Sequence, residues 1–215
     1  MRILIADDHG IVREGLRSLL AKEADMEVVG EAADGEAALQ LAAELRPDVA
    51  IVDITMPRVN WIEVIRHLRD RAPSAKVIAL SMHAEGHIVR AALEAGALAY
   101  VLKTNLFDEL RNALHAVGQG ARYLSPRVTD LVVHDWLTGQ QGPDAASPLE
   151  LTSRERQIVQ LTAEGKSVKE IAYHLGVSDK TIHANRRKLM EKLGLSTVAE
   201  LTRYAIGAGL TSLDH

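Results

Sequence analysis

Five polar side chains stand at the ends of short apolar runs, where residues from different strands can meet. They are Asp7, Asp8, Asp53, Ser81 and Lys103. Because the carboxyl ends of parallel strands lie along one edge of a sheet, we expect these side chains to converge there. Three crowded carboxylates repel one another unless a hard cation offsets their charge, and an oxygen-lined site with few protein ligands suits Mg²⁺. The pattern therefore predicts a magnesium site.

The same residues predict phosphoryl transfer. Asp53 can attack phosphorus as a carboxylate nucleophile, while Mg²⁺, Lys103 and the Ser81 hydroxyl stabilise charge on the equatorial oxygens. The product would be an aspartyl phosphate. Any one of these residues taken alone is better interpreted as a turn former, a helix cap or a solvated lysine. The ordered set favours the chemical interpretation.

The elements that must position these side chains alternate in type along the first 118 residues. Runs rich in β-branched residues predict strands, and amphipathic patterns between them predict helices. Near-continuous apolar strands separated by helices are typical of a parallel sheet covered on both faces. We therefore predict an α/β doubly wound sheet of five parallel strands, over residues 3–6, 27–32, 49–52, 77–80 and 99–102.

The pattern changes after Gly118, where only helical signals remain. A helix is expected over 125–137, and residues 139–148 have the composition of a flexible connector. We predict three parts: an α/β domain over 1–118, a linker over 119–148, and a small all-α domain over 149–215.

Two helices of the last part are marked by their ends. Thr152 and Glu155 have the spacing of a capping box, with Gly165 where that helix would stop. Ser178 can cap a second helix that runs to Gly194. The buried stripe of this second helix is predicted to hold Ile182, Leu189 and Leu193.

Composition restricts the class of protein. The chain has 215 residues, 47% apolar and 25% charged, and no cysteine, so ordinary cores can form while disulfides and thiolate sites cannot. No apolar run approaches membrane-spanning length and no signal-peptide core is present, so we expect a cytoplasmic protein with no membrane partner.

The charge is unevenly distributed. Residues 1–118 hold 13 basic and 18 acidic side chains, whereas residues 149–215 hold 10 and 8. Within 178–193 five basic side chains stand against two acidic ones. A local basic helix predicts a polyanionic partner, and the alternative is a helix face that is solvated or binds another protein.

The first domain resembles the receiver domain of bacterial two-component response regulators over residues 1 to about 118. The resemblance is carried, in order, by Asp7-Asp8-His9, Val52-Asp53-Ile-Thr-Met-Pro57, Ser81 and Tyr100-Val-Leu-Lys103. It implies a flavodoxin-like fold, Asp53 as phosphate acceptor and a sensor histidine kinase as donor. It also implies Mg²⁺ ligands at Asp8, Asp53 and the Thr55 backbone carbonyl, with Asp7 acting through water. The Ser81 hydroxyl and the Tyr100 ring would relay the signal, beside the phosphoryl-stabilising Lys103.

One departure from that family concerns the loop after Asp53. Receivers usually place glycine shortly after the Met-Pro pair, where this chain has Asn60-Trp61. The preferred interpretation is that Trp61 begins the next helix with its ring packed on the surface, and the alternatives are altered metal or phosphate access or a partner contact. His83 could tune hydrolysis of the acyl phosphate, but an exposed loop residue is preferred.

Residues 151–206 closely resemble the LuxR-type helix-turn-helix domain, from Leu-Thr-Ser-Arg-Glu-Arg through Glu170-Ile-Ala to Lys192-Leu-Gly. The resemblance places the first helix of the motif at 170–174, the turn at 175–177 and the recognition helix at 178–193. On that helix His183, Ala184 and Arg187 are predicted to read bases in the major groove. Contacts to phosphates are predicted for Lys180, Thr181, Lys188 and Lys192.

The remaining expectations concern assembly. The last helix, 197–206, lies where the family dimerises, with Thr197, Leu201 and Tyr204 expected at the contact. Phosphorylation is expected to alter dimerisation and the exposure of the recognition helix, so the phosphorylated protein should be a homodimer on an inverted repeat of double-stranded DNA. Asn185 could contact adenine, although a structural role is preferred.

These observations favour a transcription regulator controlled by phosphorylation, not an enzyme beyond the phosphorylation and dephosphorylation of its own Asp53. One alternative is a regulator that binds DNA without phosphorylation. The other is a Mg²⁺-dependent phosphohydrolase that works through an aspartyl phosphate. Such enzymes normally need a second aspartate two residues after the nucleophile, where this chain has Thr55, and a cap domain that the chain does not supply.

Overall fold

The computed structural model describes residues 1–56, 60–138, 151–208 and 210–211. The chain divides into two compact units, Met1–Gly142 and Pro143–His215, and each is considered by itself. Pro57 and the connector predicted over 139–148 lie outside the described residues.

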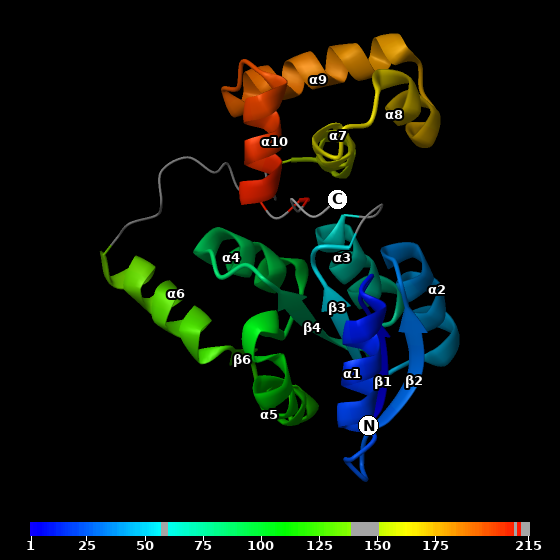
Figure 1. Cartoon of the computed structure of the whole chain (residues 1–215), viewed down its shortest axis with the longest axis vertical. Helices are drawn as coiled ribbons and strands as arrows, with labels where there is room; N and C mark the ends of the chain where they lie inside the picture. The colour runs from blue at the N-terminus through cyan, green and yellow to red at the C-terminus, as the bar shows by residue number, and fades with distance from the viewer. Residues whose placement is uncertain (57–59, 139–150, 209, 212–215) are drawn as a thin grey trace. The chain divides into compact units, whose positions relative to one another are not determined.

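The first unit is built on a parallel sheet of six strands, in the order β2-β1-β3-β4-β5-β6 (Figure 1). Five strands match the expected runs: β1 Arg2–Ala6, β2 Glu27–Ala32, β3 Val49–Asp53, β4 Lys76–Ser81 and β5 Ala99–Leu102. The expectation of five strands was wrong by one, because β6, Tyr123–Leu124, pairs in parallel with β5. Two residues are too short to produce a recognisable sequence pattern.

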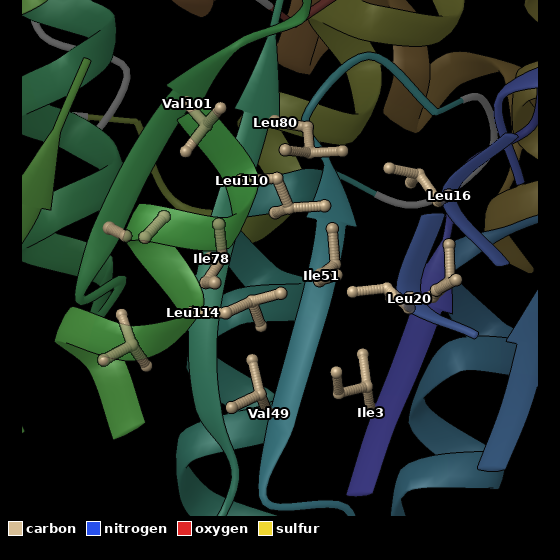
Figure 2. Close-up of a cluster of buried hydrophobic side chains, with 14 of the residues drawn as sticks. Ile3, Leu16, Leu20, Val49, Ile51, Ile78, Leu80, Val101, Leu110 and Leu114 are labelled. Atoms are coloured by element: carbon tan, nitrogen blue, oxygen red, sulfur yellow. The ribbon is translucent and has the colours of Figure 1, made fainter. Parts of the chain in front are cut away.

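Helices cover both faces of this sheet. On one face α1 (Gly10–Leu20) and α5 (Leu106–Gly118) pack against the strands, and Figure 2 shows Leu16, Leu20, Leu110 and Leu114 meeting inward side chains of the sheet. The other face is covered by α2 (Gly35–Leu45), α3 (Trp61–Arg71) and α4 (Gly86–Ala95). Every residue of β3 is buried, as expected of a central strand enclosed on both sides.

A buried serine fastens the segment after α5 to the sheet. Ser125 donates its backbone N–H to the Tyr100 carbonyl at 3.0 Å, and its hydroxyl accepts the Leu102 N–H at 3.0 Å. The same hydroxyl donates to the buried carboxylate of Glu109. Helix α6, Pro126–Thr138, begins directly after Ser125 and packs beside α4. The start of α6 is therefore attached to β5, two strands away from Asp53.

The second unit is helical in its described residues. Its helices are α7 Ser153–Ala163, α8 Val168–Leu175, α9 Asp179–Leu193 and α10 Val198–Gly207. The capping box of Thr152 and Glu155 and the Ser178 cap are both confirmed. Between α8 and α9, Gly176 adopts φ 64°, a left-handed conformation that glycine adopts without steric cost and that turns the chain sharply.

Two small hydrophobic clusters hold these four helices together. Ile182 of α9 packs with Ile158 and Ile171, while Leu189 packs with Val159 and Leu201. Leu193 is partly buried against the second cluster, so the predicted stripe of α9 does face the core.

Removing the Ser125 hydroxyl is expected to destabilise the first unit. Ser125→Ala leaves the Leu102 N–H and the Glu109 carboxylate without this partner, at a cost of about 2 kcal/mol. Calorimetry of the full chain should show the first unit's transition lowered by roughly 4–8 °C, with the second unit's transition unmoved. Ser18→Ala, on the exposed face of α1, is the matched control, and equal transitions for the two variants would contradict this account.

Candidate functional site

The predicted cluster at the carboxyl edge of the sheet is present. Asp7 and Asp8 follow β1, Asp53 ends β3 and Lys103 follows β5. The Lys103 Nζ atom lies 2.8 Å from Asp7 Oδ2 and 2.8 Å from Asp53 Oδ2. Asp7, Asp53 and Ser81, which ends β4, are completely buried. Residues that end or follow three strands are thus brought into contact, as their sequence positions predicted, and Ser81 lies at the same edge of the sheet.

Burial and the neighbouring charges together shift the pKa values of the cluster. Loss of solvent and the neighbouring Asp53 both raise the pKa of Asp7, against the lowering effect of Lys103. For Lys103, burial lowers the pKa, but attraction to Asp53 and Asp7 outweighs it and leaves the pKa raised. The lysine therefore stays charged at neutral pH, and its single positive charge is shared between two buried carboxylates.

The donor set fits a divalent cation. Ligand atoms of Asp7, Asp8, His9 and Asp53 all lie within 4.8 Å of one another. Asp8 Oδ1 is buried and accepts no hydrogen bond among the described residues, although His9 Nδ1 lies 2.9 Å from it. Carboxylate oxygens at this density suit Mg²⁺. His9 was not predicted as a member of this set, although its place after two aspartates in Asp7-Asp8-His9 was a usable signal.

Thr55 orients the predicted nucleophile through groups other than its carbonyl. Its backbone N–H and its hydroxyl donate to Asp53 Oδ1 at 3.0 and 2.7 Å. With Lys103 on Oδ2, both carboxylate oxygens of Asp53 are held in place. The role of the Thr55 carbonyl as a metal ligand stays a prediction.

Ser81 and Tyr100 are linked through the backbone of His83. The Ser81 hydroxyl accepts the His83 N–H at 2.8 Å, and the Tyr100 hydroxyl donates to the His83 carbonyl at 2.8 Å. Tyr100 is completely buried, and burial raises the pKa of its hydroxyl, so it remains a neutral donor. His83 itself is partly buried, so its description as an exposed loop residue was wrong: its backbone is the bridge between the two predicted switch residues.

Trp61 begins α3, but the ring is not on the surface. Only 2% of Trp61 is exposed, because it joins Ile62, Ile65 and Leu68 in the buried stripe of the helix. The surface packing expected from the sequence was therefore wrong. Asn60 caps the helix with φ −62°, and its side chain accepts the Ile62 N–H. Neither Asn60 nor Trp61 has a positive φ, so the absence of the usual glycine causes no backbone strain at this pair.

The predicted base-reading residues share an exposed face of α9. His183, Ala184 and Arg187 are exposed, while Ile182 and Leu189 on the opposite face are fully buried. The three exposed residues line a depression of about 620 Å³, together with Lys180. Asn185 is partly buried and lies between the two faces.

The predicted phosphate contacts differ in their surroundings. Lys180 and Lys188 are exposed, and the Thr181 hydroxyl lies 2.8 Å from the Ser178 hydroxyl that caps the helix. Lys192 instead pairs with Glu155 at 3.0 Å. Burial raises the pKa of Glu155, but hydrogen bonds from Thr152 and Lys192 outweigh it, and the pKa is lowered. Lys192 would have to share or leave this ion pair to contact a phosphate.

One predicted dimer contact is wrong. Leu201 is completely buried in the cluster that joins α10 to α7, so its side chain cannot reach a partner. Tyr204 is partly buried against the same cluster, and Thr197 caps α10. The sequence placed Leu201 on the right helix but could not tell which face the rest of the unit would cover.

Comparison with known families identifies the class of protein that this fold and site define. Residues 3–115 match the family described as response regulator receiver domain, and residues 149–205 match the bacterial regulatory proteins of the luxR family. The chain belongs to the LuxR-family response regulators, which are transcription regulators controlled through their receiver domains. The helices described are all too short or too polar to span a membrane.

Individual relatives are similar along almost the whole chain. The transcriptional regulatory protein MctR of Rhizobium johnstonii is 35% identical over 212 residues, covering 99% of this chain and 96% of that protein. UhpA of Escherichia coli is 39% identical over 201 residues, covering 94% and 95%. RcsB from Salmonella enterica serovar Typhimurium, solved on the rprA promoter with the phosphomimetic BeF₃⁻, is 31% identical with a TM-score of 0.69, covering 95% and 97%.

Neutralising Asp7 is expected to stabilise the metal-free protein. Asp7→Asn removes a buried carboxylate, and the raised pKa of that carboxyl shows that its charged form is disfavoured there. The free energy of unfolding at pH 7 should therefore increase by about 1–2 kcal/mol. Because the raised pKa makes the wild type lose stability as pH rises, the advantage of the variant should shrink as the pH is lowered and the Asp7 carboxyl becomes protonated.

Thermal unfolding with and without Mg²⁺ checks this prediction. The stabilisation that Mg²⁺ gives the wild type should decrease in Asp7→Asn. Asp130→Asn, at an exposed position of α6, is the control and should leave both quantities unchanged. A lower melting temperature for metal-free Asp7→Asn would contradict the account.

Proposed function

We propose that Asp53 is phosphorylated by a sensor histidine kinase and that the aspartyl phosphate controls DNA binding by the second unit. The observation that carries this proposal is the Asp53 carboxylate, which is buried and held between Thr55 and Lys103 at the edge of the sheet. A bond from an Asp53 oxygen to phosphorus forms as the bond from phosphorus to the donor breaks. Lys103 then faces the oxygens that gain charge.

Mg²⁺ would be held by Asp8, Asp53 and the Thr55 carbonyl, with Asp7 acting through water. When bound it offsets the carboxylate charges and the negative charge of the phosphoryl group. The self-phosphorylation and dephosphorylation of Asp53 are then the only chemistry assigned to the chain. We place its action in the cytoplasm, where DNA and the kinase domain of a sensor are both accessible.

The signal is proposed to pass from the site through the two hydrogen bonds that the His83 backbone makes with Ser81 and Tyr100. A phosphoryl group on Asp53 brings new acceptor oxygens beside Ser81, whose hydroxyl can turn toward them and release the His83 N–H. The backbone of His83 can then move, which changes the hydrogen bond from the Tyr100 hydroxyl to the His83 carbonyl. Because Ser125 bonds both the Tyr100 carbonyl and the Leu102 N–H, a shift of β5 reaches the start of α6 directly.

The output is proposed to be a homodimer on an inverted repeat of double-stranded DNA. His183, Ala184 and Arg187 would read bases, and Lys180, Thr181, Lys188 and Lys192 would contact phosphates. Thr197 and Tyr204 remain as proposed dimer contacts on α10. The exposure of this face of α9 supports the assignment, as does the DNA-bound state in which RcsB has been solved.

Phosphorylation should depend on Asp53. With a small phosphodonor and Mg²⁺, intact mass should show one phosphate adduct on the wild type and none on Asp53→Ala. Sedimentation should then show a shift toward dimer that the variant lacks. Asp48→Ala, an exposed aspartate before the same strand, should behave as the wild type. An adduct on Asp53→Ala would refute the assignment.

Base reading should depend on Arg187. Arg187→Ala is expected to lose about 1–3 kcal/mol of discrimination at one base pair, because a bidentate contact to guanine is lost. Selection from a randomised DNA library would measure the preference. Lys188→Ala should weaken binding to all sequences similarly, without changing the preferred base. An unchanged preference for Arg187→Ala would remove that residue from the reading set.

A further inference from the structure

The imidazole of His9 lies against the acidic cluster. Its Nδ1 atom is 2.9 Å from Asp8 Oδ1 and 3.2 Å from Asp7 Oδ1, and the second contact is a hydrogen bond when Nδ1 carries the proton. His9 occupies the cap position of α1, yet its side chain makes no capping hydrogen bond. Its backbone N–H donates to Asp7 Oδ1 at 2.9 Å, which fixes the residue beside the carboxylates. The side chain is therefore directed to the cluster rather than to the helix end.

The separation of His9 Nδ1 from the two aspartate oxygens matches that of neighbouring ligand atoms around one ion. Bonds of about 2.1 Å at right angles place adjacent ligand atoms about 3.0 Å apart. The distances from His9 Nδ1 to the two aspartate oxygens lie on either side of this value. A single divalent ion that replaces a proton on Nδ1 could thus bind His9 Nδ1 and Asp8 Oδ1 together with little movement of the side chains.

Lys103 does not occupy the side of the carboxylates that faces His9. Lys103 pairs with the Oδ2 atoms of Asp7 and Asp53, whereas His9 faces the Oδ1 atoms of Asp7 and Asp8. An ion on the His9 side therefore does not require the Lys103 ion pairs to break. The His9 side chain is 54% exposed, so water can complete the coordination shell.

We propose that His9 is a further metal ligand, which lets the site bind divalent ions that favour nitrogen, such as Ni²⁺, as well as Mg²⁺. Imidazole binds such ions strongly, whereas Mg²⁺ prefers oxygen ligands and retains its water. His9 therefore strengthens binding of the first class and contributes little to the second. The inference rests on the metal site of the proposed function and adds a residue that determines which ions occupy it.

The test compares two ions on the full chain. Isothermal titration calorimetry with Ni²⁺ and with Mg²⁺, at one pH, is applied to the wild type, His9→Ala and Asp8→Asn. His9→Ala should weaken the tightest Ni²⁺ site about tenfold and change the Mg²⁺ dissociation constant less than twofold. Asp8→Asn should weaken both ions, because its oxygen is shared. His115→Ala, an exposed histidine on α5, should change neither.

A second measurement locates the ion directly. Paramagnetic Ni²⁺ should broaden the ring proton signals of His9, identified by their absence in His9→Ala, at lower concentrations than those of His115. Preferential broadening at His9 together with the selective loss of Ni²⁺ affinity supports the inference.

Three results would overturn it, and they are distinguishable. If both ions bind the wild type and His9→Ala alters neither, His9 is not a ligand, while the proposed magnesium site stands. If His9→Ala weakens both ions equally, His9 only shapes the cluster. If the wild type binds neither ion, the magnesium site of the proposed function fails together with the inference.

Discussion

The structure depends on the balance of charge at one edge of the sheet. Asp7 and Asp53 are fully buried, and a single ammonium group, that of Lys103, lies 2.8 Å from an oxygen of each. Removing two carboxylates from water is costly unless they are paired and hydrogen-bonded. The strand order puts β3 between the strands that lead to Asp7 and Lys103, so the fold itself brings the three charges together. The same residual negative charge makes the cluster suitable for a cation.

The sheet also connects this site with the remainder of the chain. Tyr100 is bonded through its hydroxyl to the loop after Ser81 and through its carbonyl to Ser125. Ser125 in turn stands where α6 begins. One buried strand therefore contacts both the proposed switch and the segment that leads toward the second unit. Because close-packed side chains cover both faces of the sheet, we expect a displacement at one end of such a strand to be transmitted to the other end.

The helices of the second unit depend strongly on capping hydrogen bonds at their starts. Its helices are short, and three of them begin with a reciprocal capping box, as at Thr152 and Glu155. Such caps satisfy the backbone N–H groups that each helix start leaves free, which matters most where few side chains can be buried. Only Ile182 and Leu189 of α9 are fully buried, so most of that helix remains exposed for contact with DNA.

The sequence alone determined the local features: five of the six strands, the caps at Thr152 and Ser178, and the aspartates and lysine at strand ends. These follow from periodicity and residue type over a few neighbouring positions. Only the tertiary structure decided that Trp61 and Leu201 are buried, that His9 faces the carboxylates, and that β6 joins the sheet. The reason is physical: a helix pattern shows which residues share a face, but what covers that face is set by packing between segments far apart in the chain.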